Sequence, residues 1–148
     1  MRPILVVVDT SVLLASLLPD EPTHAAAKEV LRRALLPEGW LQLVSTTLLP
    51  YELTNGLWQA VRAGRVPLEG VETLLAQFEI FDIPLHPVPP KAVLSLAKHL
   101  GYPSAYDVAY LALAEALQAP FLTADRRLYN VVHGKFTRIV WITDFLSG

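Results

Sequence analysis

The chain has 148 residues, about the length of one typical domain, and its 53 % hydrophobic and 18 % charged residues exclude a disordered chain. A net charge of −2 excludes a general attraction to nucleic acid or anionic membranes, so an anionic substrate must be held by local basic residues or by a bound cation. The sequence contains no cysteine and no apolar run long enough to span a bilayer. We therefore expect a soluble, cytoplasmic protein with no membrane partner.

The first informative stretch is Ile4–Val8, which ends at Asp9, Thr10 and Ser11. Its three consecutive valines are typical of a parallel strand buried on both faces. In open α/β sheets ligands bind at the carboxyl ends of the strands, which makes Asp9 a candidate functional residue. Asp, Thr and Ser are also favoured helix N-caps, so a capping role for Asp9 remains an alternative.

Helical and strand patterns alternate through the next hundred residues. The expected helices are Val12–Leu18, Thr23–Leu35, Thr47–Ala63, one opened by Pro67, and one from Pro89 or Pro90 to Gly101, and the expected strands are Leu41–Ser45 and Ile83–His86. Glu52 falls in the first turn of its helix, where the macrodipole alone would favour an acid. Glu52 is thus a candidate functional residue, but its position at a helix N-terminus can also be explained without a function.

The segment Ser104–Leu117 is apolar almost all the way round, which predicts a helix buried on most sides. Its only charged residues are Asp107 and Glu115. An acid in such a helix must be paired, hydrogen-bonded or metal-bound to stay ionised, which favours a functional role for Asp107.

Two further strands complete the pattern. Ala119–Ala124 leads into Asp125, with Arg126 and Arg127 following, and so repeats the arrangement at Asp9. Ile139–Ile142 is the last expected strand, after which Asp144 is expected to cap a terminal turn.

This alternation predicts a three-layer α/β/α sandwich with a mostly parallel central sheet. In that fold Asp9, Glu52, Asp107 and Asp125 lie at one edge of the sheet and can converge. Gathered carboxylates repel one another until a proton or a cation relieves the repulsion, and oxygen ligands suit Mg²⁺ or Mn²⁺. Such a site can orient water for attack on phosphorus and stabilise the charge that develops there.

The sequence resembles a PIN domain of the VapC toxin type over nearly the whole chain, and we expect residues 1–148 to form this single domain. The matching segments are VVVDTSVLLASLLPDEPTHAAA, LLPYELTNGLWQA, SAYDVAYLALAEAL and FLTADRRL, in that order. The resemblance implies a metal-dependent endoribonuclease with Asp9, Glu52, Asp107 and Asp125 as catalytic and metal-binding residues. It also implies support of the site by the hydroxyls of Ser11 and Thr123.

The resemblance further implies partners: an RNA substrate, a small antitoxin protein and a second copy of the chain in a homodimer. Many relatives carry a basic residue just before the third acid, where this chain has Gly101-Tyr102-Pro103. The basic candidates for RNA contact are therefore Arg126 and Arg127.

Other functions remain open at this point. The acids could merely cap helices in a non-catalytic binding or regulatory α/β domain, or the chain could be a housekeeping nuclease without an antitoxin. A phosphatase that forms an aspartyl-phosphate on Asp9 is disfavoured, because enzymes resembling haloacid dehalogenases need a second Asp where Ser11 stands.

Overall fold

The computed structural model describes residues 3–148, and at their centre lies a five-stranded sheet in the order β3-β2-β1-β4-β5. Every neighbouring pair is parallel. The strands are β1 (Ile4–Val8), β2 (Leu41–Thr46), β3 (Leu85–His86), β4 (Phe121–Thr123) and β5 (Ile139–Trp141). Val6, Val7 and Val8 in the central strand are fully buried, as expected for a strand covered on both faces.

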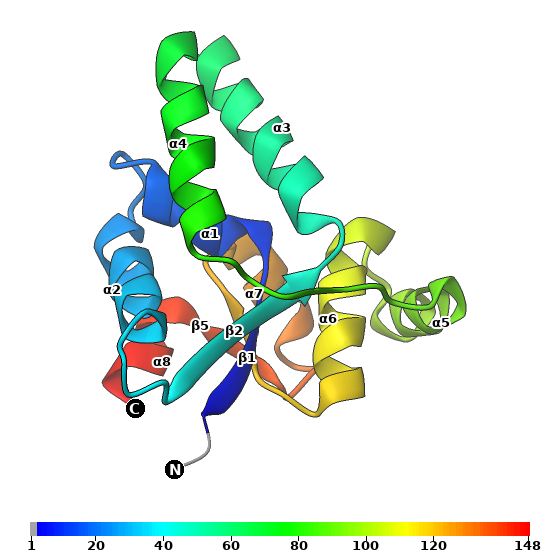
Figure 1. The fold of residues 1–148 in the computed structure, drawn as a ribbon. Helices are drawn as coiled ribbons and strands as arrows, with labels where there is room; N and C mark the ends of the chain where they lie inside the picture. Colours follow the sequence, from blue (N-terminus) through cyan, green and yellow to red (C-terminus); the bar gives the residue numbers. More distant parts are fainter. Residues whose placement is uncertain (1–2) are drawn as a thin grey trace.

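Helices cover both faces of this sheet. They are α1 (Thr10–Leu17), α2 (His24–Ala34), α3 (Leu49–Arg62), α4 (Leu68–Ile80), α5 (Pro90–Leu100), α6 (Ala105–Leu117), α7 (Arg126–Val132) and α8 (Ile142–Ser147). Figure 1 shows α2 and α8 on one side of the strands and α5 and α6 on the other. The predicted three-layer α/β/α fold is therefore confirmed. None of the helices within residues 3–148 has the length and apolar character needed to cross a membrane.

Helices α3 and α4 form the expected helical hairpin, which projects from the body of the molecule (Figure 1). Gly64, just after α3, has a φ of 75°, a conformation that residues with a side chain rarely adopt. Within α3, a Cβ atom at Gly56 would lie 2.6 Å from Cδ1 of Leu14. The glycine therefore lets α3 lie directly against α1, which brings the beginnings of both helices to the same edge of the sheet.

One local prediction near the C-terminus needs correction, and one helix there was not anticipated. Helix α7 follows Asp125, whose side chain accepts a hydrogen bond from the Leu128 amide and caps the helix. Asp144 is not an N-cap, because α8 begins at Ile142 directly after β5. Ile142 is fully buried, so packing of this residue sets the start of the helix and leaves Asp144 in its first turn.

Candidate active site

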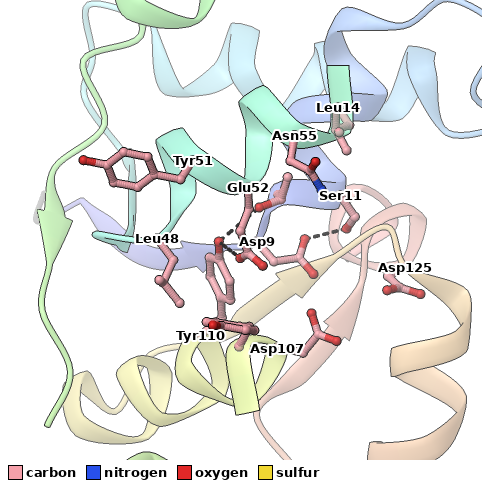
Figure 2. Close-up of a pocket in the computed structure, with 13 residues that line it drawn as sticks. Asp9, Ser11, Leu14, Leu48, Tyr51, Glu52, Asn55, Asp107, Tyr110 and Asp125 are labelled. Atoms are coloured by element: carbon pink, nitrogen blue, oxygen red, sulfur yellow. Dashed lines mark hydrogen bonds between the residues drawn. The ribbon is translucent and has the colours of Figure 1, made fainter. Parts of the chain in front are cut away.

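A cavity of about 500 Å³ lies at the carboxyl edge of the sheet and contains all four predicted acids in its lining. Asp9 follows β1, Glu52 and Asp107 lie in the first turns of α3 and α6, and Asp125 precedes α7. Figure 2 shows these four side chains arranged around one hollow. Parallel strands and the helices that follow them thus gather acids that lie up to 116 positions apart in the sequence.

Asp9 is the most deeply placed of the four, with only 6 % of its surface exposed. Ser11 Oγ donates a hydrogen bond to Oδ1 at 2.5 Å, and Thr123 Oγ1 donates one to Oδ2 at 2.8 Å. Burial raises the pKa of Asp9 to about 7, although these two hydroxyls act in the opposite direction. The Asp9 carboxylate is therefore fixed in position, and it needs a proton or a cation near neutral pH.

Ser11 and Thr123 also connect Asp9 to the loop that carries Asp125. The Ala124 amide donates to Ser11 Oγ at 2.9 Å, and the Asp125 amide donates to Thr123 Oγ1 at 3.0 Å. Both hydroxyls thus accept a backbone hydrogen bond from this loop while donating to Asp9. This arrangement couples the ends of β1 and β4.

Glu52 is held from the opposite side of the cavity by Tyr110 of α6. The Tyr110 hydroxyl donates to Glu52 Oε1 at 2.5 Å and lies 3.0 Å from Thr10 Oγ1. Burial and the Glu52 carboxylate both raise the pKa of Tyr110, which keeps the phenol protonated. Figure 2 shows the phenol pointing toward Glu52 from below.

Asp107 and Asp125 are half-buried and face the same cavity. The pKa of Asp107 is raised, first by burial and then by the charges of Glu52 and Asp125. The carboxylates of Glu52 and Asp125 therefore lie close enough to Asp107 to disfavour its ionised form, even though each of the three acids comes from a different element.

The lining suits a divalent cation in its donor chemistry. Among the described residues that line the cavity, four are carboxylates and none is a lysine or arginine. In residues 3–148 no three acidic, histidine or cysteine side chains lie close enough together to bind one ion directly. Mg²⁺ commonly keeps several waters and takes only one or two protein carboxylates, so this looser set of oxygen donors fits it.

The two predicted RNA contacts, Arg126 and Arg127, begin α7 beside Asp125, and both are exposed. The Arg126 guanidinium lies 3.7 Å from the centre of the Trp141 ring, a cation–π contact that fixes its position. Neither arginine lines the cavity itself.

Sequence reasoning missed Tyr110 and Thr10. Tyr110 lies three residues after Asp107 and hence on the same side of α6. A buried tyrosine hydroxyl usually has a hydrogen-bond partner. A tyrosine one turn after a candidate acid in an apolar helix could therefore have been predicted to contact the site.

The chain matches a known protein family and a curated relative. The family model "PIN domain" matches residues 6–134, and the chain therefore belongs to the PIN domain family. Among curated proteins the chain is similar to Ribonuclease VapC3 of Pyrobaculum aerophilum. The two are 29 % identical over 126 residues, which cover 82 % of this chain and 90 % of the relative.

Solved structures agree with the fold. PAE2754 from Pyrobaculum aerophilum has a TM-score of 0.72 and 23 % identity, and the match covers 99 % of this chain and 96 % of that one. VapC20 from Mycobacterium tuberculosis, described as a sarcin-ricin loop cleaving toxin, has a TM-score of 0.59 and 14 % identity, with 88 % and 95 % covered. At these identities the likeness concerns the fold alone.

Proposed function

We propose that this protein is a divalent-metal-dependent endoribonuclease, the toxin of a toxin–antitoxin pair. The observation that carries the proposal is the cavity at the sheet edge, which four carboxylates line and to which no lysine or arginine of residues 3–148 contributes. Membership of the PIN domain family and similarity to a protein named Ribonuclease VapC3 support the same activity.

Mg²⁺ or Mn²⁺, bound by carboxylates from the set Asp9, Glu52, Asp107 and Asp125, would neutralise charge on the scissile phosphate and activate water for its hydrolysis. The chain's own part is to hold the carboxylates in place before the metal arrives. Asp9 is fixed by the hydroxyls of Ser11 and Thr123, which accounts for the supporting role proposed for these two residues.

The bound cation would also compensate the repulsion between the RNA phosphates and the carboxylates of the cavity. An RNA phosphate entering a cavity lined by acids is repelled unless the negative charge is compensated. Because no lysine or arginine of the described part of the chain lines the cavity, the metal would supply the attraction inside, and basic residues outside it would add to the affinity.

Arg127 is the basic residue we assign to the RNA backbone next to the site, with Arg126 beside it. Arg126 stacks on Trp141, so its charge is held at a fixed place, whereas Arg127 has no such aromatic contact among the described residues. Arg127→Ala is expected to weaken RNA binding uniformly across sequences and to reduce its salt dependence, as loss of one phosphate contact does.

Exposed aromatic side chains at the mouth of the cavity suit unpaired bases. Tyr51 is 78 % exposed and Tyr106 is 66 % exposed, and both line the cavity. Bases of single-stranded RNA stack on such rings without regard to sequence. These tyrosines are better placed for stacking than Trp141, which is buried against Arg126.

The same proposal includes protein partners. By analogy with VapC-type toxins, a small antitoxin would cover the acidic cavity, and two copies of the chain would form a homodimer in the cytoplasm. Light scattering of the purified chain tests the dimer. Co-purification with the product of an adjacent short reading frame, followed by loss of nuclease activity on its addition, tests the antitoxin.

The decisive experiment incubates the purified protein, free of antitoxin, with tRNA, rRNA and mRNA in Mg²⁺ or Mn²⁺. We expect cleavage by the wild type and none by Asp9→Asn or in the presence of a chelator. Asp144→Asn is the matched control, since this exposed acid lies in α8 and does not line the cavity. Cleavage that survives in Asp9→Asn, or the absence of cleavage with every substrate, contradicts the proposal.

A further inference from the structure

The buried phenol of Tyr110 has one hydroxyl proton and lies beside three polar side chains, those of Glu52, Thr10 and Thr46. It donates this proton to Glu52 Oε1, so the Thr10 hydroxyl must be the donor in its contact with the Tyr110 oxygen. A continuous chain of donors therefore runs from Thr10, which begins α1 directly after Asp9, through Tyr110 to Glu52.

The placement of Tyr110 makes this contact rigid. Only 1 % of its surface is exposed, and the residue is part of the packed core beneath the cavity. Glu52, by contrast, is a half-exposed side chain on α3 with three rotatable bonds. A fixed donor on α6 thus selects one orientation of a mobile carboxylate that belongs to another helix.

We propose that Tyr110 is a positioning residue, which holds Glu52 Oε1 so that Oε2 is presented to the divalent cation. This inference rests on the proposed function, because it assumes that Glu52 is a metal ligand. Outer hydrogen-bond partners of metal ligands typically change metal affinity or activity by about 10- to 100-fold when they are removed.

The same contact joins the two helices that supply acids to the cavity. Tyr110 is on α6, three residues after Asp107, and its hydroxyl reaches Glu52 on α3. One helix therefore provides a cavity acid and fixes the acid opposite it. Loss of the hydroxyl is expected to affect the site while the ring continues to fill its place in the core.

The test measures Mn²⁺ binding by calorimetry on the full chain without RNA. Tyr110→Phe, which removes only the hydroxyl, is expected to weaken Mn²⁺ binding by about 10- to 100-fold. Tyr129→Phe is the control, because this tyrosine lies on α7 outside the cavity, and it is expected to bind Mn²⁺ as the wild type does. Circular dichroism verifies that each variant is folded.

A double-mutant cycle separates positioning from general damage to the structure. If Tyr110 acts through Glu52, Tyr110→Phe changes Mn²⁺ affinity less than about twofold in a Glu52→Gln background. In cleavage assays at a saturating Mn²⁺ concentration, Tyr110→Phe is expected to lower kcat and leave the KM for RNA unchanged.

Each outcome has a distinct meaning. Wild-type affinity in Tyr110→Phe overturns the inference and leaves the proposed nuclease intact. An equal loss in both backgrounds also overturns it, since it indicates a structural role for the hydroxyl. A wild-type chain that binds no Mn²⁺ overturns both this inference and the metal dependence of the proposed function.

Discussion

Replacing Asp9 by Asn is expected to stabilise the metal-free protein at high pH. Burial raises the pKa of Asp9 from 3.8 to about 7, so the folded state disfavours the ionised form. Asn has nearly the same shape, and its amide can still pair with the hydroxyls of Ser11 and Thr123 if these rotate. The variant therefore removes a buried charge while keeping the local contacts.

The sign and size follow from proton linkage. Between pH 3.8 and about 7 the folded state binds more protons at Asp9 than the unfolded state, so wild-type stability falls as the pH rises. With about 1.4 kcal/mol for each pKa unit, the raised pKa of Asp9 costs the folded protein about 4 kcal/mol at pH 8, where Asp9 is ionised, and less than about 2 kcal/mol at pH 5, where it takes up a proton on folding. Asp9→Asn avoids this cost.

The assay is urea unfolding of wild type and Asp9→Asn in EDTA at pH 5 and pH 8. We expect Asp9→Asn to be the more stable protein at pH 8, with an advantage that shrinks by about 2 to 3 kcal/mol at pH 5. Adding Mn²⁺ at pH 8 should stabilise only the wild type, by mass action. A difference between the two proteins that does not depend on pH, or a variant less stable at pH 8, would refute this account of Asp9.

The remaining predictions concern single contacts around the site. Thr123→Val removes the hydroxyl that donates a hydrogen bond to the Asp9 carboxylate, so it should lower RNA cleavage. Because a hydrogen bond to a charged group is lost, the metal-bound protein should also be less stable by about 1.5 to 3 kcal/mol in urea unfolding; unchanged cleavage would contradict this. Gly56→Ala places a Cβ 2.6 Å from Cδ1 of Leu14 and should push this side chain off its rotamer, at a cost of about 0.5 to 1.5 kcal/mol of stability, measured by thermal unfolding; a melting temperature equal to wild type would show that Leu14 yields freely. Arg126→Ala removes the cation–π contact with Trp141 and should lower stability by about 0.5 to 1 kcal/mol in low and high salt alike, a result that chemical denaturation at two salt concentrations distinguishes from a simple surface charge.

The sequence by itself determined the kinds of elements and their order, with the exception of helix α7. A run of valines with no polar interruption is buried on both faces wherever it packs, and helices bounded by proline and glycine begin and end where local backbone chemistry requires. Asp9 and Asp125 follow strands in the sequence, so a parallel sheet was enough to expect them at one edge. These inferences depend only on the order of neighbouring residues, which can be read from a single sequence.

Local pattern was a weaker guide where two roles share one residue. Glu52 and Asp107 each lie in the first turn of a helix, a position that favours acids whether or not they have a function. Asp125 does two things at once, since it caps α7 through the Leu128 amide and also faces the cavity. Only the surroundings of such a residue distinguish these roles.

The tertiary structure alone decided which groups meet across the cavity. The Tyr110 hydroxyl reaches Glu52 over 58 positions of sequence, and Thr123 reaches Asp9 over 114, distances at which residue spacing carries no information about contact. The same holds for Arg126, whose position depends on the ring of Trp141 at the end of β5. Hydrogen bonds form at about 3 Å, and burial depends on which groups surround a side chain. The packing of whole elements therefore determines the environment of each acid, and with it the pKa of Asp9.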